Sequence, residues 1–156
     1  MEDDIRELYQ EVILDHGKNP RNFRHPEDAT SEANGNNPLC GDKLTVFVKI
    51  GAGQNIEDAA FEGRGCAISV ASASMMTDIV IGKKIPEVDA LFEIFHKMCK
   101  GEEVGKTPEE FEDDIEKLMV LSGVKQFPMR VKCATLAWHT INAAVHGEQT
   151  VSSDNQ

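Results

Sequence analysis

Three cysteines and one aspartate are the residues of this sequence best suited to chemistry. Cys40 and Asp42 lie two residues apart around a glycine in the segment PLCGD, Cys66 ends the segment FEGRGC, and Cys133 ends the segment FPMRVKC. A cysteine thiolate is both a nucleophile and a soft metal ligand. Together the four residues could therefore bind Zn²⁺, bind an iron–sulfur cluster or carry sulfur covalently.

The sequence around the three cysteines favours one shared site. Each cysteine lies next to glycine, proline or an expected helix start, which allows close approach of the backbone. Three thiolates and the Asp42 carboxylate supply the ligands of a tetrahedral Zn²⁺ site, and with iron the same residues could hold a [2Fe–2S] cluster. The alternative is that the cysteines are scattered structural residues. No pair has CxxC spacing, which excludes an ordinary zinc ribbon or a thioredoxin-like site.

Cys66 and Cys133 are expected to be the more acidic thiols. Both precede a segment with helical periodicity, and the partial positive charge at a helix start stabilises a thiolate. Arg130 and Lys132 add positive charge beside Cys133, which lowers a thiol pKa further. We therefore predict that Cys133 is the nucleophile. Cys99 shares an apolar stripe with phenylalanines, so we expect it to be buried and inert.

The rest of the sequence predicts the elements that hold these residues. Apolar residues at helical spacing predict five helices. Alternating β-branched and aromatic residues predict one strand, which a turn joins to a second strand in a hairpin, and a short third strand follows. The helices are expected at residues 4–15, 69–81, 86–100, 107–122 and 134–146, and the strands at residues 43–50, 56–63 and 66–68. We therefore expect an α+β fold, with a small antiparallel three-stranded sheet flanked by about five helices.

Two stretches rich in turn-forming residues are expected to be loops. Residues 30–39 would deliver Cys40 to the site, and residues 124–132 would lead into Cys133. On this interpretation Cys133 lies immediately before the last helix.

Charge and length limit the classes of function. The formal net charge of −11 disfavours nucleic acid and anionic membranes, which bind clustered Lys and Arg. A basic patch on another protein is the expected partner of the acidic helix at residues 107–122. No apolar run reaches the roughly 20 residues that span a bilayer, and the acidic N-terminus is no targeting signal, so we expect a cytoplasmic protein. We expect a single domain over residues 1–156, frayed at residues 1–3 and 148–156.

Five segments of the chain are similar to one known family. They are LYQEVILDHGKNPRNF, NPLCGD, KLTVFVKI, FEGRGCAISVASASMM and VKCATLAWHTINAAV. Through them nearly the whole chain resembles the IscU/NifU-N/SufU family of iron–sulfur cluster assembly proteins, for which NPLCGD together with GxGCAIS is specific. The resemblance implies a SufE/NifU-like fold and metal ligands at Cys40, Asp42, Cys66 and Cys133. It also implies a pyridoxal-phosphate-dependent cysteine desulfurase as partner, which passes persulfide sulfur to one of the cysteines.

Three features make the chain most similar to the SufU branch of this family. Lys132 stands where the scaffold branch has a histidine, only Pro128 remains of that branch's proline-rich signature, and residues 101–121 resemble an extra helix. The resemblance implies bound Zn²⁺ and a sulfurtransferase-like role, that of a sulfur acceptor and carrier and not of a turnover enzyme. It further implies that Cys133 leaves the metal to accept the sulfur, supported by Arg130. A downstream scaffold or apo-protein then receives the sulfur.

Two other functions are compatible with the same residues. In the first, Cys40, Cys66 and Cys133 hold a labile [2Fe–2S] cluster, which is assembled on this chain and transferred to apo-proteins. In the second, the chain is a structural zinc domain that only binds partners. The lysine before Cys133 favours sulfur transfer over the scaffold, and cysteines at expected helix starts favour both over the structural domain.

Overall fold

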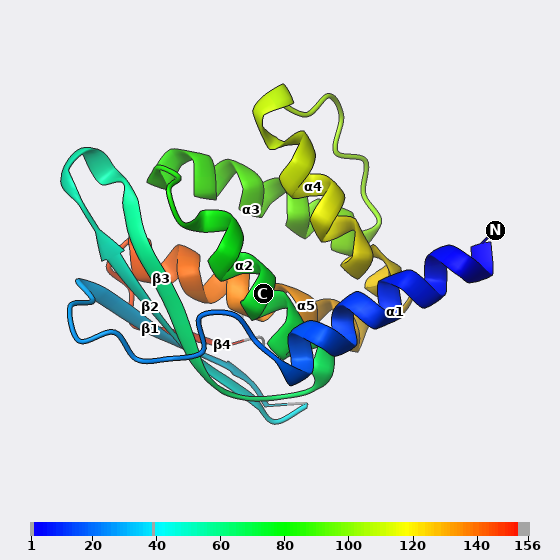
Figure 1. The fold of residues 1–156 in the computed structure, drawn as a ribbon, viewed down its shortest axis with the longest axis horizontal. Helices are drawn as coiled ribbons and strands as arrows, with labels where there is room; N and C mark the ends of the chain where they lie inside the picture. Colours follow the sequence, from blue (N-terminus) through cyan, green and yellow to red (C-terminus); the bar gives the residue numbers. More distant parts are fainter. Residues whose placement is uncertain (1, 39, 153–156) are drawn as a thin grey trace.

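The computed structural model describes residues 2–38 and 40–152, with side chains described for residues 9–38 and 40–149 (Figure 1). In chain order the elements are α1 (Glu2–Lys18), β1 (Ser31–Asn37), β2 (Asp42–Ile50), η1 (Ala52–Gln54), β3 (Ile56–Arg64), α2 (Ala67–Val80), α3 (Ile85–Lys100), η2 (Glu109–Phe111), α4 (Glu112–Leu118), η3 (Met119–Gln126), α5 (Pro128–Val145) and β4 (Thr150–Ser152), where η denotes a 3₁₀ helix.

A sheet with the strand order β3–β2–β1–β4 forms one side of the molecule. β1, β2 and β3 are antiparallel neighbours, with Ser31 opposite Val48 and Val46 opposite Phe61. The α+β fold with three antiparallel strands and five helices is therefore confirmed. The short β4, which lies within the segment that we expected to fray, adds to β1 in parallel as a fourth strand.

β1 is the longer of the two strands that the sequence analysis missed. The predictions of a loop at residues 30–39 and of a third strand at residues 66–68 are wrong, because β1 occupies residues 31–37 and α2 begins at Ala67. β1 pairs with β2 along its whole length, and its buried positions include the small residues Ala33 and Gly35. Pairing between neighbouring strands here outweighs the low strand propensity of Asn and Gly.

The α-helices lie on one face of the sheet (Figure 1). α5 packs directly on β1 and β2, α2 contacts α5 and β3, and α1 and α3 pack against α2 and α5 respectively. β1 approaches α5 closely at Gly35, where a Cβ atom would collide with Thr140 Oγ1. None of the helices in the described part of the chain combines the length and apolar character that crossing a bilayer requires.

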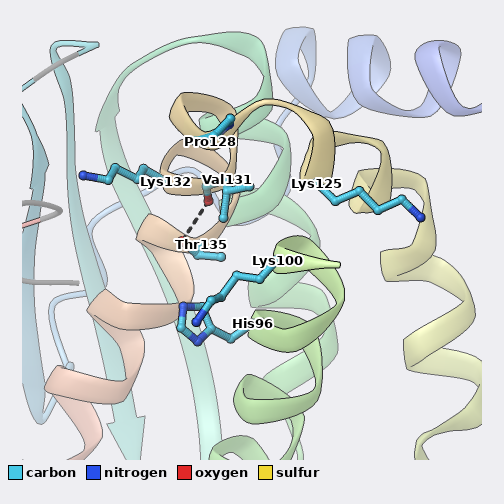
Figure 2. Close-up of a pocket in the computed structure, with 7 residues that line it drawn as sticks. All are labelled: His96, Lys100, Lys125, Pro128, Val131, Lys132 and Thr135. Carbon is cyan, nitrogen blue, oxygen red and sulfur yellow. Dashed lines mark hydrogen bonds between the residues drawn. The ribbon is translucent and has the colours of Figure 1, made fainter. Parts of the chain in front are cut away.

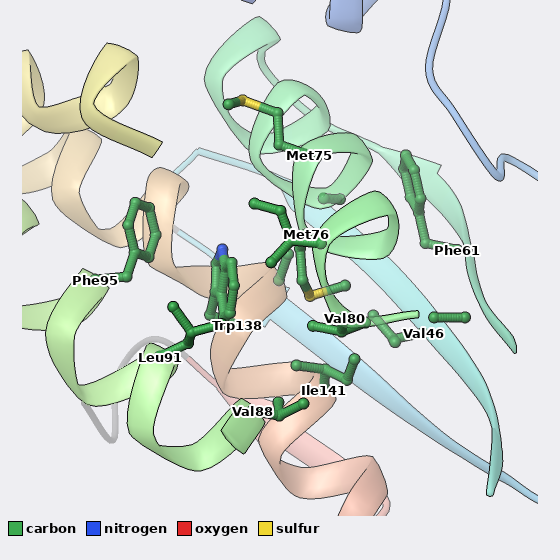
Figure 3. Packing of buried hydrophobic residues seen from close by; sticks show 14 of the residues in the cluster. Val46, Phe61, Met75, Met76, Val80, Val88, Leu91, Phe95, Trp138 and Ile141 are labelled. Atoms are coloured by element: carbon green, nitrogen blue, oxygen red, sulfur yellow. The ribbon is translucent and has the colours of Figure 1, made fainter. Parts of the chain in front are cut away.

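The hydrophobic core lies between the sheet and the helices (Figure 3). Trp138 of α5 lies at its centre, with its ring centroid 5.3 Å from that of Phe95, and contributes to one buried cluster with Leu91, Met76 and Ile141. Each large side chain buried in this way contributes roughly 1.5–3 kcal/mol. The core therefore fixes α2, α3 and α5 relative to one another.

α5 begins earlier than predicted. It starts at Pro128 and not at about residue 134, so the prediction of a loop at residues 124–132 is wrong. Proline fits the first helical turn, because the N–H that it lacks would have no partner there. The helix predicted at residues 107–122 is divided among η2, α4 and η3. Cys133 consequently lies inside α5 and not before it.

Candidate metal centre

The end of the β1–β2 hairpin carries two of the predicted ligands. Cys40 lies in the turn, and Asp42 is the first residue of β2. The backbone N–H groups of Cys40 and Gly41 donate to the carbonyl oxygen of Asn37, at 3.3 and 2.8 Å. Gly41 has a φ of 73°, in the region that favours glycine. The glycine between the two ligands is therefore required by the turn.

Cys133 reaches this hairpin from α5. Its Sγ lies 3.5 Å from Cys40 Sγ, and the ligand atoms of Cys40, Asp42 and Cys133 all lie within 4.8 Å of one another. With Zn–S bonds of about 2.3 Å, two sulfurs of a tetrahedral site are about 3.8 Å apart. The spacing and chemistry of these three residues therefore fit a Zn²⁺ ion. No other group of three such ligands occurs in the part of the chain that the structure describes.

Cys66, the fourth predicted ligand, adjoins this group from the start of α2. Its backbone N–H donates to Asp42 Oδ1 at 2.9 Å, and its Sγ accepts a hydrogen bond from the Ser69 N–H at 3.4 Å. Gly65 permits this approach, since a Cβ atom there would lie 2.6 Å from Asp42 Oδ1. The structure thus brings three of the predicted ligands within 4.8 Å of one another and holds Cys66 beside them.

The thiols of Cys66 and Cys133 differ in acidity. The pKa of Cys66 falls to about 6, first because of its contact with the Cys133 thiol and then because of the backbone N–H groups of Ser69 and Ile68. The pKa of Cys133 is raised, because its contact with Cys66, burial and Asp42 all oppose loss of its proton. The prediction of a low pKa for Cys133 is therefore wrong for the protein without a bound metal. Cys133 is 2% exposed inside α5 and does not lie at the helix start.

Asn37 is a member of the site that the sequence analysis did not identify. It is fully buried, and its Nδ2 lies 3.3 Å from Asp42 Oδ2 and 3.6 Å from Cys133 Sγ. In the sequence it resembles another turn-forming residue of GNNPLCGD. The signal that could have found it is its position directly before PLCGD, which places it opposite Asp42 once a hairpin is assumed.

The first turn of α5 presents exposed cationic and apolar side chains. The Arg130 guanidinium carbon lies 4.9 Å from the centre of the Phe127 ring, and Phe127 and Met129 are each about half exposed. On the flank of α5, a hollow of about 310 Å³ lies between α3, η3 and α5, and the three lysines that line it point in different directions (Figure 2). An acidic chain thus carries a locally cationic surface around the start of α5.

Residues 8–150 match the NifU-like N terminal domain family. The chain therefore belongs to this family, and the resemblance to the IscU/NifU-N/SufU proteins is confirmed.

Individual relatives carry two kinds of name. The chain is 42% identical over 144 residues to the zinc-dependent sulfurtransferase SufU of Bacillus subtilis (strain 168), covering 91% of this chain and 92% of that protein. It is 43% identical over 141 residues to the iron–sulfur cluster assembly scaffold protein IscU of Streptococcus pyogenes serotype M1, covering 90% of this chain and 84% of that protein. A crystal structure of a proposed scaffold protein for the SUF system from Fervidobacterium islandicum AW-1 superimposes with a TM-score of 0.78 at 34% identity, covering 86% of this chain and 94% of the other.

Proposed function

We propose that this protein is a zinc-bound sulfur acceptor and carrier in iron–sulfur cluster assembly, which takes persulfide sulfur from a pyridoxal-phosphate-dependent cysteine desulfurase. The observation that carries the proposal is the group of ligand atoms from Cys40, Asp42 and Cys133 within 4.8 Å of one another. The identity of 42% to a protein named a zinc-dependent sulfurtransferase supports it. The proposed metal ligands are these three residues and Cys66.

The donor set suits zinc better than a hard cation. Thiolate ligands favour Zn²⁺ or iron, whereas Mg²⁺ and Ca²⁺ favour oxygen ligands. When bound, Zn²⁺ keeps its thiolate ligands deprotonated and has no redox chemistry of its own. The backbone also holds the Asp42 carboxylate in place, because the Cys66 N–H donates to its Oδ1.

The proposed transfer exchanges one sulfur atom between two cysteines. The Cys133 thiolate attacks the terminal sulfur of the donor's persulfide, so that an S–S bond forms on Cys133 and the donor's own S–S bond breaks. The donor cysteine leaves as a thiolate, and no oxidant or reductant is consumed. Arg130, which is exposed on the first turn of α5, can place a positive charge near the arriving persulfide anion.

Cys66 is the competing acceptor. Cys66 is exposed, and in the protein without a bound metal its pKa of about 6 makes it a more acidic thiol than Cys133. We favour Cys133 because it follows the exposed first turn of α5, on which a partner can dock. Its departure from the site would also leave Asp42 in place, since Asp42 is held by the backbone of Cys66.

The test is to incubate the zinc-loaded protein with a cysteine desulfurase and cysteine and to locate the added sulfur by mass spectrometry of peptides. We expect one sulfur on Cys133 and none in the Cys133→Ser variant. Cys99→Ser is the matched control, because Cys99 is buried and its pKa is raised to about 12 by burial, and it should accept sulfur as the wild type does. Sulfur uptake by Cys133→Ser at the wild-type rate would show that another cysteine is the acceptor.

Assembly of a labile [2Fe–2S] cluster on the same residues is the second candidate. It is supported by the identity of 43% to a protein named a scaffold. The two functions differ in the content of the purified protein. About one zinc per chain without sulfide, and faster turnover of the desulfurase on addition of the protein, would support sulfur transfer. Iron and sulfide in equal amounts, with a cluster that moves to an apo-protein, would support the scaffold.

A further inference from the structure

Asn37 is an uncharged polar residue at the centre of the proposed ligand set. It ends β1, it pairs across the hairpin with Asp42, and both residues are fully buried. A buried amide is costly unless it forms hydrogen bonds. The hydrogen-bond partners of the Asn37 amide therefore indicate its role.

The contacts of Asn37 reach three of the four proposed ligands. Its side-chain Nδ2 lies 3.3 Å from Asp42 Oδ2 and 3.6 Å from Cys133 Sγ. An amide NH₂ group has two N–H donors, so one can serve each acceptor. Its backbone carbonyl accepts hydrogen bonds from Cys40 and Gly41 and so fixes the turn that carries the first cysteine.

The two acceptors are the groups that would carry negative charge in a metal site. The Cys66 N–H already occupies Asp42 Oδ1, so that Asn37 is the donor on the other oxygen. A donor beside a ligating carboxylate or thiolate orients the ligand and stabilises its charge, and the loss of such a donor commonly weakens metal binding 10- to 100-fold.

We propose that Asn37 is a positioning residue of the metal centre, whose amide donates to Asp42 and Cys133 together and holds them in the geometry that binds zinc. The inference rests on the proposed ligand set. The role of Asn37 does not depend on which cysteine accepts sulfur. A negative result in the sulfur-transfer test would therefore not decide it, and the zinc-binding measurements below test it separately.

Substitutions of similar size distinguish the loss of the Asn37 N–H donors from a change in side-chain volume. Asn37→Leu keeps the bulk and removes both N–H donors, and Asn37→Asp replaces the donor by a further negative charge. The neighbouring Asn36, half-buried and on the opposite face of β1, gives the matched controls Asn36→Leu and Asn36→Asp.

The first measurement is the affinity for Zn²⁺, in competition with a chromophoric chelator. We expect binding roughly 10- to 100-fold weaker for Asn37→Leu and weaker still for Asn37→Asp, with both Asn36 variants within twofold of the wild type. Zinc affinities of the Asn37 variants within twofold of the wild type would overturn the proposal. A purely structural role would lower the stability of the chain and leave the zinc affinity of its folded fraction unchanged.

A second measurement needs no variant and so does not depend on whether the Asn37 variants fold. In wild-type protein loaded with an NMR-active isotope of Cd²⁺, a hydrogen bond to a ligating sulfur transmits scalar coupling between the metal and the N–H proton. We expect this coupling at the side-chain amide of Asn37. The Ser69 N–H, which donates to Cys66 Sγ, serves as the internal standard. Coupling at Ser69 without coupling at Asn37 would contradict the proposed contact with Cys133.

Discussion

The thiols of Cys66 and Cys133 have their pKa values shifted in opposite directions. Cys133 is buried against Cys66, Cys40 and Asp42, and its pKa is raised, whereas the pKa of Cys66 is lowered to about 6. Both shifts follow from one contact, in which the Cys133 thiol stabilises the thiolate of Cys66. A proton thus lies among groups that otherwise carry negative charge, and a metal ion that binds them must displace it. Zinc affinity should therefore fall as the pH falls.

Alkylation of the zinc-free protein at pH 7 should reveal the same difference. We expect Cys66 to react faster than Cys133, because Cys66 is exposed and mostly thiolate above its pKa of about 6. Cys99 should remain unmodified, since burial raises its pKa to about 12. Mass spectrometry of peptides over time measures the three rates. Modification of Cys133 before Cys66 would be inconsistent with the contact described here.

The sequence predicted the proposed metal ligands more readily than the residues that contact them. Cys40, Asp42 and Cys133 stand out by residue type, and Cys40 and Asp42 also by the glycine between them. The ligand atoms of all three lie together. Asn37 did not stand out, because an asparagine in a turn-rich segment has many ordinary explanations. Only its pairing with Asp42 across the hairpin distinguishes it.

At the scale of elements, the predictions succeeded where the pattern was local. The strand at residues 43–50 was predicted because β-branched and aromatic residues alternate there, and the turn that follows it predicted a hairpin partner at residues 56–63. Both strands are present, as β2 and β3. β1 was missed because its residues SEANGNN are polar and form a strand only through pairing with β2 and β4. The start of α5 was missed because Pro128 was interpreted as a break in a loop, although it is the first residue of the helix.

The contact between β1 and α5 predicts an unusual response to a glycine substitution. Alanine normally stabilises a strand relative to glycine, by about 0.5–1 kcal/mol. Gly35→Ala should instead destabilise the protein by about 1–3 kcal/mol, because the new methyl group would collide with Thr140 Oγ1. Urea unfolding measures the change.

Two controls accompany this prediction. Gly123→Ala in η3 should instead stabilise the protein by about 0.5–1 kcal/mol, since no other part of the structure lies within 4 Å of the added Cβ. Thr140→Ala should relieve part of the effect of Gly35→Ala, because it removes the colliding oxygen. A Gly35→Ala variant as stable as the wild type would mean that β1 and α5 can separate easily.

At the scale of the whole molecule, stability should fall between pH 6.5 and pH 4. Burial, and then His96, lower the pKa of His139 to about 4 from an ordinary value of 6.5. The unfolded chain therefore binds this proton before the folded chain does, and the stability present above pH 6.5 is lost as the pH falls. From His139 alone the loss should be about 2 kcal/mol at pH 5.

The variant His139→Phe, which keeps an aromatic ring near Phe92 and His96, should lack this loss. Denaturant unfolding of zinc-free protein at pH 7.5 and pH 5 provides the comparison. The Arg24–Asp58 pair should not interfere, because the pKa of Asp58 is lowered by Arg24 and its contribution is lost only below pH 4. Equal changes with pH in the two proteins would assign the loss to other groups.

The burial of Cys133 bears on how a carrier would keep its cargo. Its side chain is 2% exposed, whereas Cys40 and Cys66 are exposed. Small soluble thiols remove sulfane sulfur by direct attack, which requires access to the terminal atom. Sulfur on a residue as buried as Cys133 would be protected against such leakage. Loading and delivery would then both depend on a docked partner that uncovers it, so that docking, and not diffusion of small molecules, would set where the sulfur goes.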